Sequence, residues 1–131
     1  MIVLDASAAI EWLLDSRSGQ KIDGLMISHG DELHVPHLLD IEVAQVLRRL
    51  VLQGKVAARD AVEALHVLAG MSCVRYPHYF YISRIWDLRN NLSAYDAMYV
   101  ALAESLDALL VTCDPRLAAS PGHRARIQLI T

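Results

Sequence analysis

Two short apolar segments near the two ends of the chain constrain its fold most strongly. Residues 1–4 (Met-Ile-Val-Leu) and residues 109–112 (Leu-Leu-Val-Thr) show no alternation of apolar and polar side chains, and each is closely followed by an aspartate. Strands that are buried on both faces read as continuous apolar runs, which is typical of parallel sheets. We therefore predict that both segments are central strands of a parallel sheet.

Helical and strand patterns alternate between these two segments. Apolar residues recur at helical spacing in residues 7–14, 17–27, 38–52, 57–69, 79–89 and 95–106. Shorter strands are expected at residues 33–35, 74–76 and 127–130. Alternating strands and helices predict an α/β fold in which helices cover both faces of a mostly parallel sheet, a three-layer α/β/α arrangement.

Length and composition favour one folded domain spanning residues 1–131. Of these residues, 54% are hydrophobic, enough to build a core, and we find no repeat or linker. No apolar run approaches the length of a membrane span, and the N-terminus lacks a secretion signal, so we expect a cytoplasmic protein. Cys73 and Cys113 have no metal-binding spacing and are expected to be reduced thiols. The net charge of −3 excludes a polycation that coats nucleic acid, but it allows local basic patches.

Four acidic residues lie at the edges of apolar segments: Asp5, Glu42, Asp96 and Asp114. Buried carboxylates are rare unless a partner or a metal neutralises them, because removing a charge from water costs several kcal/mol. The ligand crevice of a parallel sheet lies beyond the carboxyl ends of its strands, where we place Asp5 and Asp114. We place Glu42 and Asp96 in the first turns of helices that leave the same edge. Such an oxygen-rich cluster is suited to Mg²⁺ or Mn²⁺.

The segments around these acids resemble the four acidic motifs of PIN-domain ribonucleases, and the small size resembles the VapC toxins of bacterial toxin–antitoxin pairs. The resemblance rests on Val3-Leu4-Asp5-Ala6-Ser7-Ala8, on Leu38-Leu39-Asp40-Ile41-Glu42-Val43, on Tyr95-Asp96-Ala97-Met98-Tyr99-Val100-Ala101-Leu102-Ala103 and on Leu110-Val111-Thr112-Cys113-Asp114. It implies a three-layer α/β/α fold and an endoribonuclease that depends on Mg²⁺ or Mn²⁺. It also implies a homodimer and inhibition by a cognate antitoxin protein.

On this interpretation Asp5, Glu42, Asp96 and Asp114 hold the metal, directly or through water, and RNA phosphodiesters are hydrolysed by metal-activated water. Ser7 and Thr112 would donate hydrogen bonds to these carboxylates or to metal-bound water. Two simpler roles are nearly as well supported. Ser7 could cap the N-terminus of a helix, and Thr112 could be an ordinary strand residue.

Basic residues near the motifs are candidates for contact with RNA. Arg116 closely follows Asp114 and could bind a substrate phosphate. A basic flank could be formed by Arg48, Arg49, Lys55 and Arg59. A solvated helix face explains those four charges equally well.

Four other features have interpretations other than a role in the site. Asp40 precedes Glu42 by two residues and so points about 200° away on a helix, which favours a charge at the helix start over a role in the site. His37 is a poor ligand for a hard cation. A stripe at helical spacing is most often core, although it could form a dimer or antitoxin face: Tyr79, Ile82, Trp86 and Arg89. Trp12 has the same ambiguity.

Two other functions remain open. A metal-dependent phosphatase with Asp5 as nucleophile would need a second aspartate at position 7, where Ser7 stands. It would also need a late catalytic lysine, whereas the chain contains Lys21 and Lys55. A catalytically inactive PIN-like interaction module would keep the fold and pair its acids with arginines. Stabilisation by added Mn²⁺ would separate an acidic metal site from such ion pairs.

Overall fold

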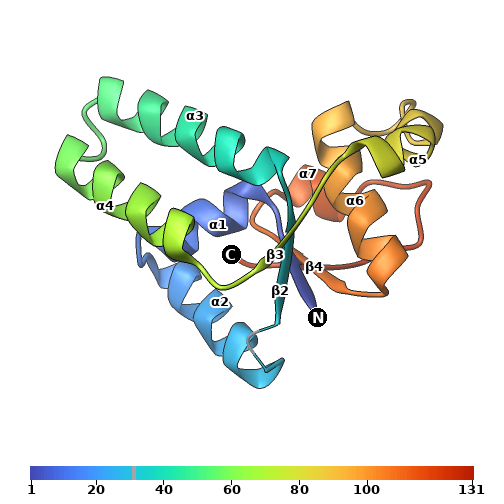
Figure 1. The fold of residues 1–131 in the computed structure, drawn as a ribbon, viewed down its shortest axis with the longest axis horizontal. Coiled ribbons are helices and arrows are strands. Elements are labelled where there is room, and N and C mark those ends of the chain that lie inside the picture. The colour runs from blue at the N-terminus through green and yellow to red at the C-terminus, as the bar shows by residue number, and fades with distance from the viewer. Residues whose placement is uncertain (31) are drawn as a thin grey trace.

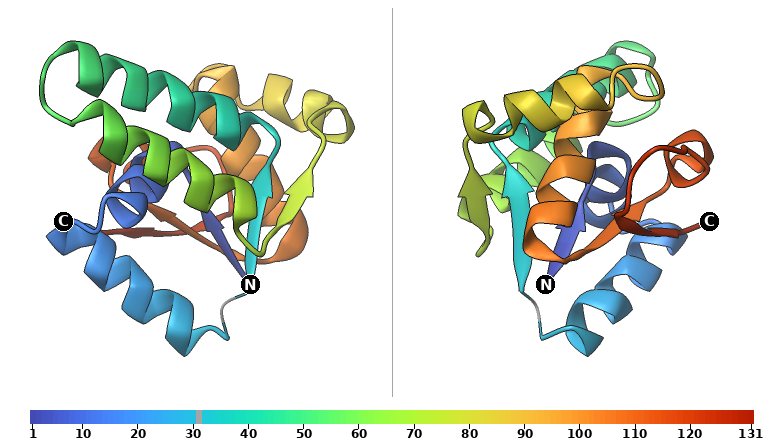
Figure 2. Two further views of the ribbon diagram at one scale, coloured as in Figure 1. Left: turned by 60° about the vertical axis from the view of Figure 1, so that its left-hand side comes forward. Right: turned by 90° about the vertical axis from the view of Figure 1, so that its right-hand side faces the viewer.

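A computed structural model describes residues 1–30 and 32–131 and shows a five-stranded parallel sheet with helices on both faces (Figures 1 and 2). The strands are β1 Ile2–Leu4, β2 Leu33–Pro36, β3 Val74–Tyr76, β4 Leu109–Thr112 and β5 Arg126–Leu129. Their order across the sheet is β3-β2-β1-β4-β5, and each neighbouring pair is parallel. The predicted α/β/α fold class is confirmed.

The helices occupy the connections between strands. They are α1 Ala6–Leu13, α2 Arg17–Ser28, α3 Leu38–Leu52, α4 Ala58–Gly70, the 3-10 turn η1 Tyr79–Tyr81, α5 Ile82–Asp87, α6 Ala94–Leu106 and α7 Pro115–Ala118. Helices α1 to α4 pack with one another on one side of the sheet, and α5 packs with α6 on the other side (Figure 1). Within residues 1–30 and 32–131, no helix is long and apolar enough to cross a membrane.

The core is built around β1, β4 and α6. Strand β1 lies between β2 and β4, and its residues are at most 1% exposed. Helix α6 packs against β1, β2 and β4, and all seven residues from 97 to 103 are buried. An element with no solvated face needs no polar stripe. The predicted central position of the two terminal apolar segments is therefore confirmed.

Parallel pairing brings the carboxyl ends of β1 and β4 to one edge of the sheet. Leu4 aligns with Val111, so both strands end within one residue of each other. The chain then turns directly into α1 after β1 and into α7 after β4 (Figure 2). Side chains at these two junctions must therefore lie close together, and this edge is where a parallel sheet usually binds its ligand.

The segment predicted as one helix over residues 79–89 is divided into η1 and α5, and α7 was not predicted. Tyr79, Ile82 and Trp86 are 65%, 53% and 65% exposed, so the interpretation of their stripe as core is wrong. The buried side of this segment is instead carried by Ile85 and Leu88. Helical spacing identifies one face of a helix, but it does not show whether another element covers that face.

The thiols of Cys73 and Cys113 are free and half-buried.

Two glycines of α2 give a matched test of the packing between α1 and α2. A Cβ atom built on Gly19 would lie 2.1 Å from the Glu11 carbonyl oxygen, whereas a Cβ on Gly24 meets nothing within 4 Å. Gly19→Ala should lower the free energy of unfolding by roughly 1–3 kcal/mol or more, because the two helix backbones must move apart. Gly24→Ala should raise it by about 0.5–1 kcal/mol through helix propensity. Urea unfolding measures both, and an unperturbed Gly19→Ala variant would contradict this packing.

Candidate active site

Asp5 is the most firmly held acid at this edge. Its backbone is extended, with φ −81° and ψ 175°, and its side chain caps α1. One carboxylate oxygen, Oδ1, accepts hydrogen bonds from the Ala8 amide at 2.9 Å and from the Ser7 hydroxyl at 2.7 Å. The other, Oδ2, accepts from the Thr112 hydroxyl at 2.5 Å. With these partners Asp5 is a fixed carboxylate, 4% exposed, at the junction of β1, α1 and β4.

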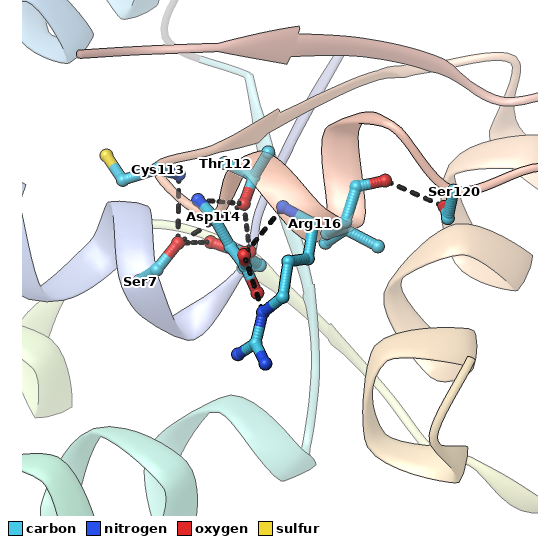
Figure 3. Close-up of polar contacts among 8 residues, drawn as sticks. Ser7, Thr112, Cys113, Asp114, Arg116 and Ser120 are labelled. Carbon is cyan, nitrogen blue, oxygen red and sulfur yellow. Dashed lines mark hydrogen bonds and ion pairs between the residues drawn. The ribbon is translucent and has the colours of Figure 1, made fainter. Parts of the chain in front are cut away.

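Ser7 and Thr112 also connect to the backbone beyond β4. The Cys113 amide donates to the Ser7 hydroxyl at 2.9 Å, and the Asp114 amide donates to the Thr112 hydroxyl at 2.9 Å (Figure 3). Ser7 lies inside α1, so the interpretation of Ser7 as the helix cap is wrong, since Asp5 is the cap. Both hydroxyl groups donate to Asp5, the geometry expected of residues that orient a carboxylate.

Glu42 reaches the crevice from α3 and is held from α6. It is the fifth residue of α3, one turn beyond the predicted first turn. Its Oε1 accepts a 2.6 Å hydrogen bond from the Tyr99 hydroxyl, whose side chain is 1% exposed. Tyr99 was not among the residues predicted for the site. The available signal was its position three residues after Asp96, on the same face of a helix.

Asp96 and Asp114 begin helices. The Asp96 amide donates to the Ser93 hydroxyl at 3.2 Å, which places Asp96 in the first turn of α6. Asp114 caps α7, and its Oδ1 accepts from the Arg116 amide at 2.9 Å. The Arg116 side chain is 93% exposed, and its Nε lies 3.7 Å from the same oxygen. These acids are therefore presented by helix starts at the edge of the sheet.

Two cavities meet at these acids. The larger, of about 560 Å³, is bordered by α3 residues, including Glu42, Gln45 and Arg49. The smaller, of about 370 Å³, is bordered by residues that include Asn91 and Ser93. Three residues border both cavities: Asp96, Asp114 and Arg116. The crevice thus has two limbs that meet at two of the acids.

Burial and mutual repulsion raise the pKa of three of these acids. Burial raises the pKa of Asp5, although its hydrogen bonds oppose this, and the charge of Asp114 adds to the rise. Burial also raises the pKa of Glu42, with the Tyr99 hydrogen bond opposing and Asp96 and Asp5 adding. The pKa of Asp96 is raised by burial, then by Asp114 and Asp5. The acids therefore interact across the crevice, which favours a compensating cation.

The donor atoms suit a hard divalent cation. All are carboxylate or hydroxyl oxygens, which Mg²⁺ and Mn²⁺ prefer. Among the residues that the structure describes, no three His, Cys, Asp or Glu side chains are close enough to share one ion directly. Mg²⁺ is usually bound by one or two carboxylates and keeps several waters, so the arrangement is compatible with such an ion.

Asp40 lies outside this crevice. Its carboxylate forms a two-pronged ion pair with Arg75, at 2.9 and 3.1 Å, and Arg75 also donates to the Leu68 carbonyl at 2.8 Å. The ion pair ties α3 to β3 and the end of α4. Asp40 thus has a structural partner that sequence spacing could not reveal, because Arg75 is 35 residues away.

The residues of the predicted basic flank border different cavities. Arg49 borders the larger limb of the crevice, whereas Arg48 borders an apolar cavity between α3 and α4. Lys55 borders a separate cavity beside α4, and Arg59 lies next to Asp60 at 3.7 Å. A role of these side chains in RNA binding stays a prediction. Separately, half-buried Trp12 donates to Asp23 at 3.2 Å and so belongs to the contact between α1 and α2.

Comparison with known families identifies the fold. A profile described as PIN domain matches residues 2–122. The chain belongs to the PIN-domain family. It is 46% identical over 130 residues to VapC ribonuclease Mb0985 of Mycobacterium bovis, covering 99% of this chain and 98% of that one. It is 40% identical over 129 residues to ribonuclease VapC1 of Mycobacterium tuberculosis, covering 98% and 96%. The predicted resemblance to VapC-type PIN domains is confirmed.

Solved structures agree with this assignment. The crystal structure of PAE2754 from Pyrobaculum aerophilum superposes with a TM-score of 0.69 at 28% identity, covering 96% of this chain and 81% of that one. The sarcin–ricin loop cleaving toxin VapC20 of Mycobacterium tuberculosis has a TM-score of 0.69 at 16% identity, covering 91% and 94%. At that identity VapC20 supports the fold alone.

Burial and the repulsion among the acids raise the pKa of Asp96, which predicts how pH affects the stability of the metal-free PIN domain. The folded-state pKa of Asp96 lies above its ordinary value of 3.8, so the folded state binds more protons between those two values. Stability therefore falls as pH rises through this window. In EDTA at about pH 7.5, Asp96→Asn should melt at or above the temperature of the wild type, and the difference should shrink as pH approaches 4.

Thermal melts across this pH range make the measurement. Glu63→Gln, an exposed position on α4, is the control and should change the melting temperature little at any pH. A melting temperature of Asp96→Asn well below that of the wild type at pH 7.5 would show that the carboxylate has a stabilising partner.

Proposed function

We propose that the chain is a divalent-metal-dependent endoribonuclease and the toxin of a VapBC-type toxin–antitoxin pair. The observation that carries the proposal is that Glu42, Asp96 and Asp114 border one cavity of a PIN domain, while the charge of the buried Asp5 adds to the rise in pKa that burial causes at Glu42 and Asp96. The 46% identity to a protein named VapC ribonuclease supports RNA as the substrate.

Phosphodiester hydrolysis requires an activated water, a neutralised phosphate and a stabilised leaving oxygen. A bound Mg²⁺ or Mn²⁺ would supply this chemistry without a nucleophilic side chain. We assign Asp5, Glu42, Asp96 and Asp114 as the residues that would hold the ion, one or two of them directly and the others through water. Only oxygen donors are available from these side chains, which agrees with a hard cation.

The chain's own groups would orient the site and the RNA. Ser7 and Thr112 fix Asp5 through hydrogen bonds at 2.7 and 2.5 Å, so its oxygens keep one position. Arg116 is exposed at the meeting point of the two limbs, where its guanidinium could contact a phosphate. Arg49 and Gln45 border the larger limb and would face nucleotides on one side of the cleaved bond.

The proposal also covers the partner proteins and the location of the chain. The partner proteins are a cognate antitoxin and a second copy of this chain, and the location is the cytoplasm. Exposed apolar side chains on η1 and α5, among them Tyr79, Phe80 and Trp86, support an interface with another protein. Light scattering of the purified protein measures whether it is dimeric.

The two alternative functions explain the geometry less well. A phosphatase that uses Asp5 as nucleophile would need a second aspartate at position 7, where the Ser7 hydroxyl instead donates a 2.7 Å hydrogen bond to Asp5. An interaction module would pair its acids with arginines. Two-pronged arginine pairs do occur, at Asp40 with Arg75 and at Glu104 with Arg84, outside the crevice.

A matched pair of substitutions on α3 tests the active-site assignment. Glu42→Gln keeps an acceptor for Tyr99 but removes the charge, so RNA cleavage should fall roughly 100-fold or more, beyond the 10–100-fold typical for a partner of a metal ligand. Asp40→Asn removes a charge two residues away and should leave cleavage within about 3-fold, because Asp40 binds Arg75 instead. Cleavage assays with purified proteins in Mg²⁺ or Mn²⁺ decide the matter. Equal activity of Glu42→Gln and wild type would remove Glu42 from the site.

Metal binding can be measured without a cleavage assay, from the melting temperature of the protein. A ligand that binds only the folded state stabilises it by about 2.7 kcal/mol at a concentration 100 times its Kd. Mn²⁺ should therefore raise the melting temperature of the wild type, and much less that of Asp96→Asn. Addition of EDTA should reverse the rise and abolish cleavage. An unchanged wild-type melting temperature at millimolar Mn²⁺ would favour the interaction module.

A further inference from the structure

Tyr99 is a polar residue in an otherwise apolar buried segment. Residues 97–103 of α6 are all buried, and Tyr99 is the single member with a polar side-chain atom. A phenylalanine would fill the same space in the core. A buried hydroxyl without a partner destabilises the folded state, so the hydroxyl of Tyr99 must be explained by what it contacts.

The contact is a carboxylate of the crevice. The Tyr99 hydroxyl donates to Glu42 Oε1 at 2.6 Å, which joins α6 to α3 across 57 residues of sequence. The hydroxyl has one hydrogen, and this bond uses it. Asp96 lies one turn earlier on α6. The same helix therefore carries Asp96 itself and, through Tyr99, holds Glu42 of α3 by a hydrogen bond.

The bond uses Oε1 of Glu42 and leaves Oε2 available to bind a cation. Within the described part of the chain, Tyr99 provides the one hydrogen bond that the Glu42 carboxylate receives, and Glu42 borders the larger limb of the crevice. A glutamate side chain has several rotatable bonds and loses rotamer entropy when it is fixed in one conformation. A single strong donor at its end therefore decides where the second oxygen points.

We propose that Tyr99 is a positioning residue that orients Glu42 toward the cation site of the crevice. Its role matches that of Ser7 and Thr112 at Asp5, but it comes from the core of the protein rather than from the loop beside the acid. The inference rests on the proposed function for the identity of the ligand. It adds a residue to which no role in this site has been assigned.

The central variant is Tyr99→Phe, which removes the hydroxyl and keeps the ring. Its effect on Mn²⁺ binding is read from melting temperatures at increasing Mn²⁺, and we expect a 10–100-fold higher concentration for the half-maximal rise. In RNA cleavage, kcat should fall while KM for RNA stays within about 2-fold, since Tyr99 is buried and touches no substrate.

Tyr76→Phe is the matched control. Its hydroxyl also lies at hydrogen-bond distance from a side chain, 2.7 Å from buried His34, but that side chain does not border the crevice. Tyr76 is half-buried, so Tyr76→Phe should lose less stability than Tyr99→Phe without metal, and it should keep the Mn²⁺ response of the wild type. A general effect of losing a tyrosine hydroxyl on the Mn²⁺ response would appear in both variants.

A double-mutant cycle tests whether Tyr99 acts through Glu42. In the Glu42→Gln background, adding Tyr99→Phe should change the Mn²⁺ response less than 2-fold, because the carboxylate that Tyr99 orients is gone. Full additivity of the two effects would overturn the inference. If Tyr99→Phe fails to fold, Glu42→Asp provides the second test. It keeps the charge and the tyrosine but shortens the side chain, and it should weaken the Mn²⁺ response by a similar factor.

The outcomes separate this inference from the proposed function. A wild type that binds Mn²⁺ but cleaves no RNA would overturn the nuclease, and a weaker Mn²⁺ response of Tyr99→Phe would still support the positioning role. A nuclease whose Tyr99→Phe variant matches the wild type in Mn²⁺ response and kcat would overturn the positioning role alone. A wild type whose melting temperature does not respond to Mn²⁺ would overturn both.

Discussion

The fixation of Asp5 at the end of β1 is the constraint on which the site depends. Its carboxylate is buried and accepts hydrogen bonds from Ser7, Ala8 and Thr112. These bonds lock the start of α1 to the end of β4, which in turn sets the direction of the chain at Asp114. Burial of this carboxylate disfavours its charged form, and the three hydrogen bonds offset part of that cost.

Glu42 and Asp96 are also carboxylates whose burial disfavours the charged form. Glu42 and Asp96 come from two different helices, yet the pKa of each is raised by burial and by other acids of the site. Elsewhere in the chain acids are neutralised by arginine, as Glu104 is by Arg84 at 2.8 and 2.9 Å. The contrast distinguishes acids that are paired with arginine from the four acids that we propose as the metal site.

Local patterns predicted most of the fold because burial on both faces leaves a plain signature. The apolar runs of β1 and β4 and the start of α6 at Ser93 follow from side-chain type alone. The four acids could be placed at one edge because parallel strands end together. Hydrogen-bond partners that are distant in sequence could not be predicted, namely Tyr99 for Glu42 and Arg75 for Asp40. The exposure of Trp86 was also missed, since helical spacing does not say which side is covered.

Anomalous diffraction from crystals soaked in Mn²⁺ tests the central claim most directly, because it locates the ion without any assay of activity. The account predicts a peak in the crevice where Asp96 and Asp114 border both limbs. At least one carboxylate oxygen of the four acids should lie about 2.1 Å from it, with waters completing the coordination. A fully soaked crystal with an empty crevice, or with Mn²⁺ bound only at other acids, would contradict the account.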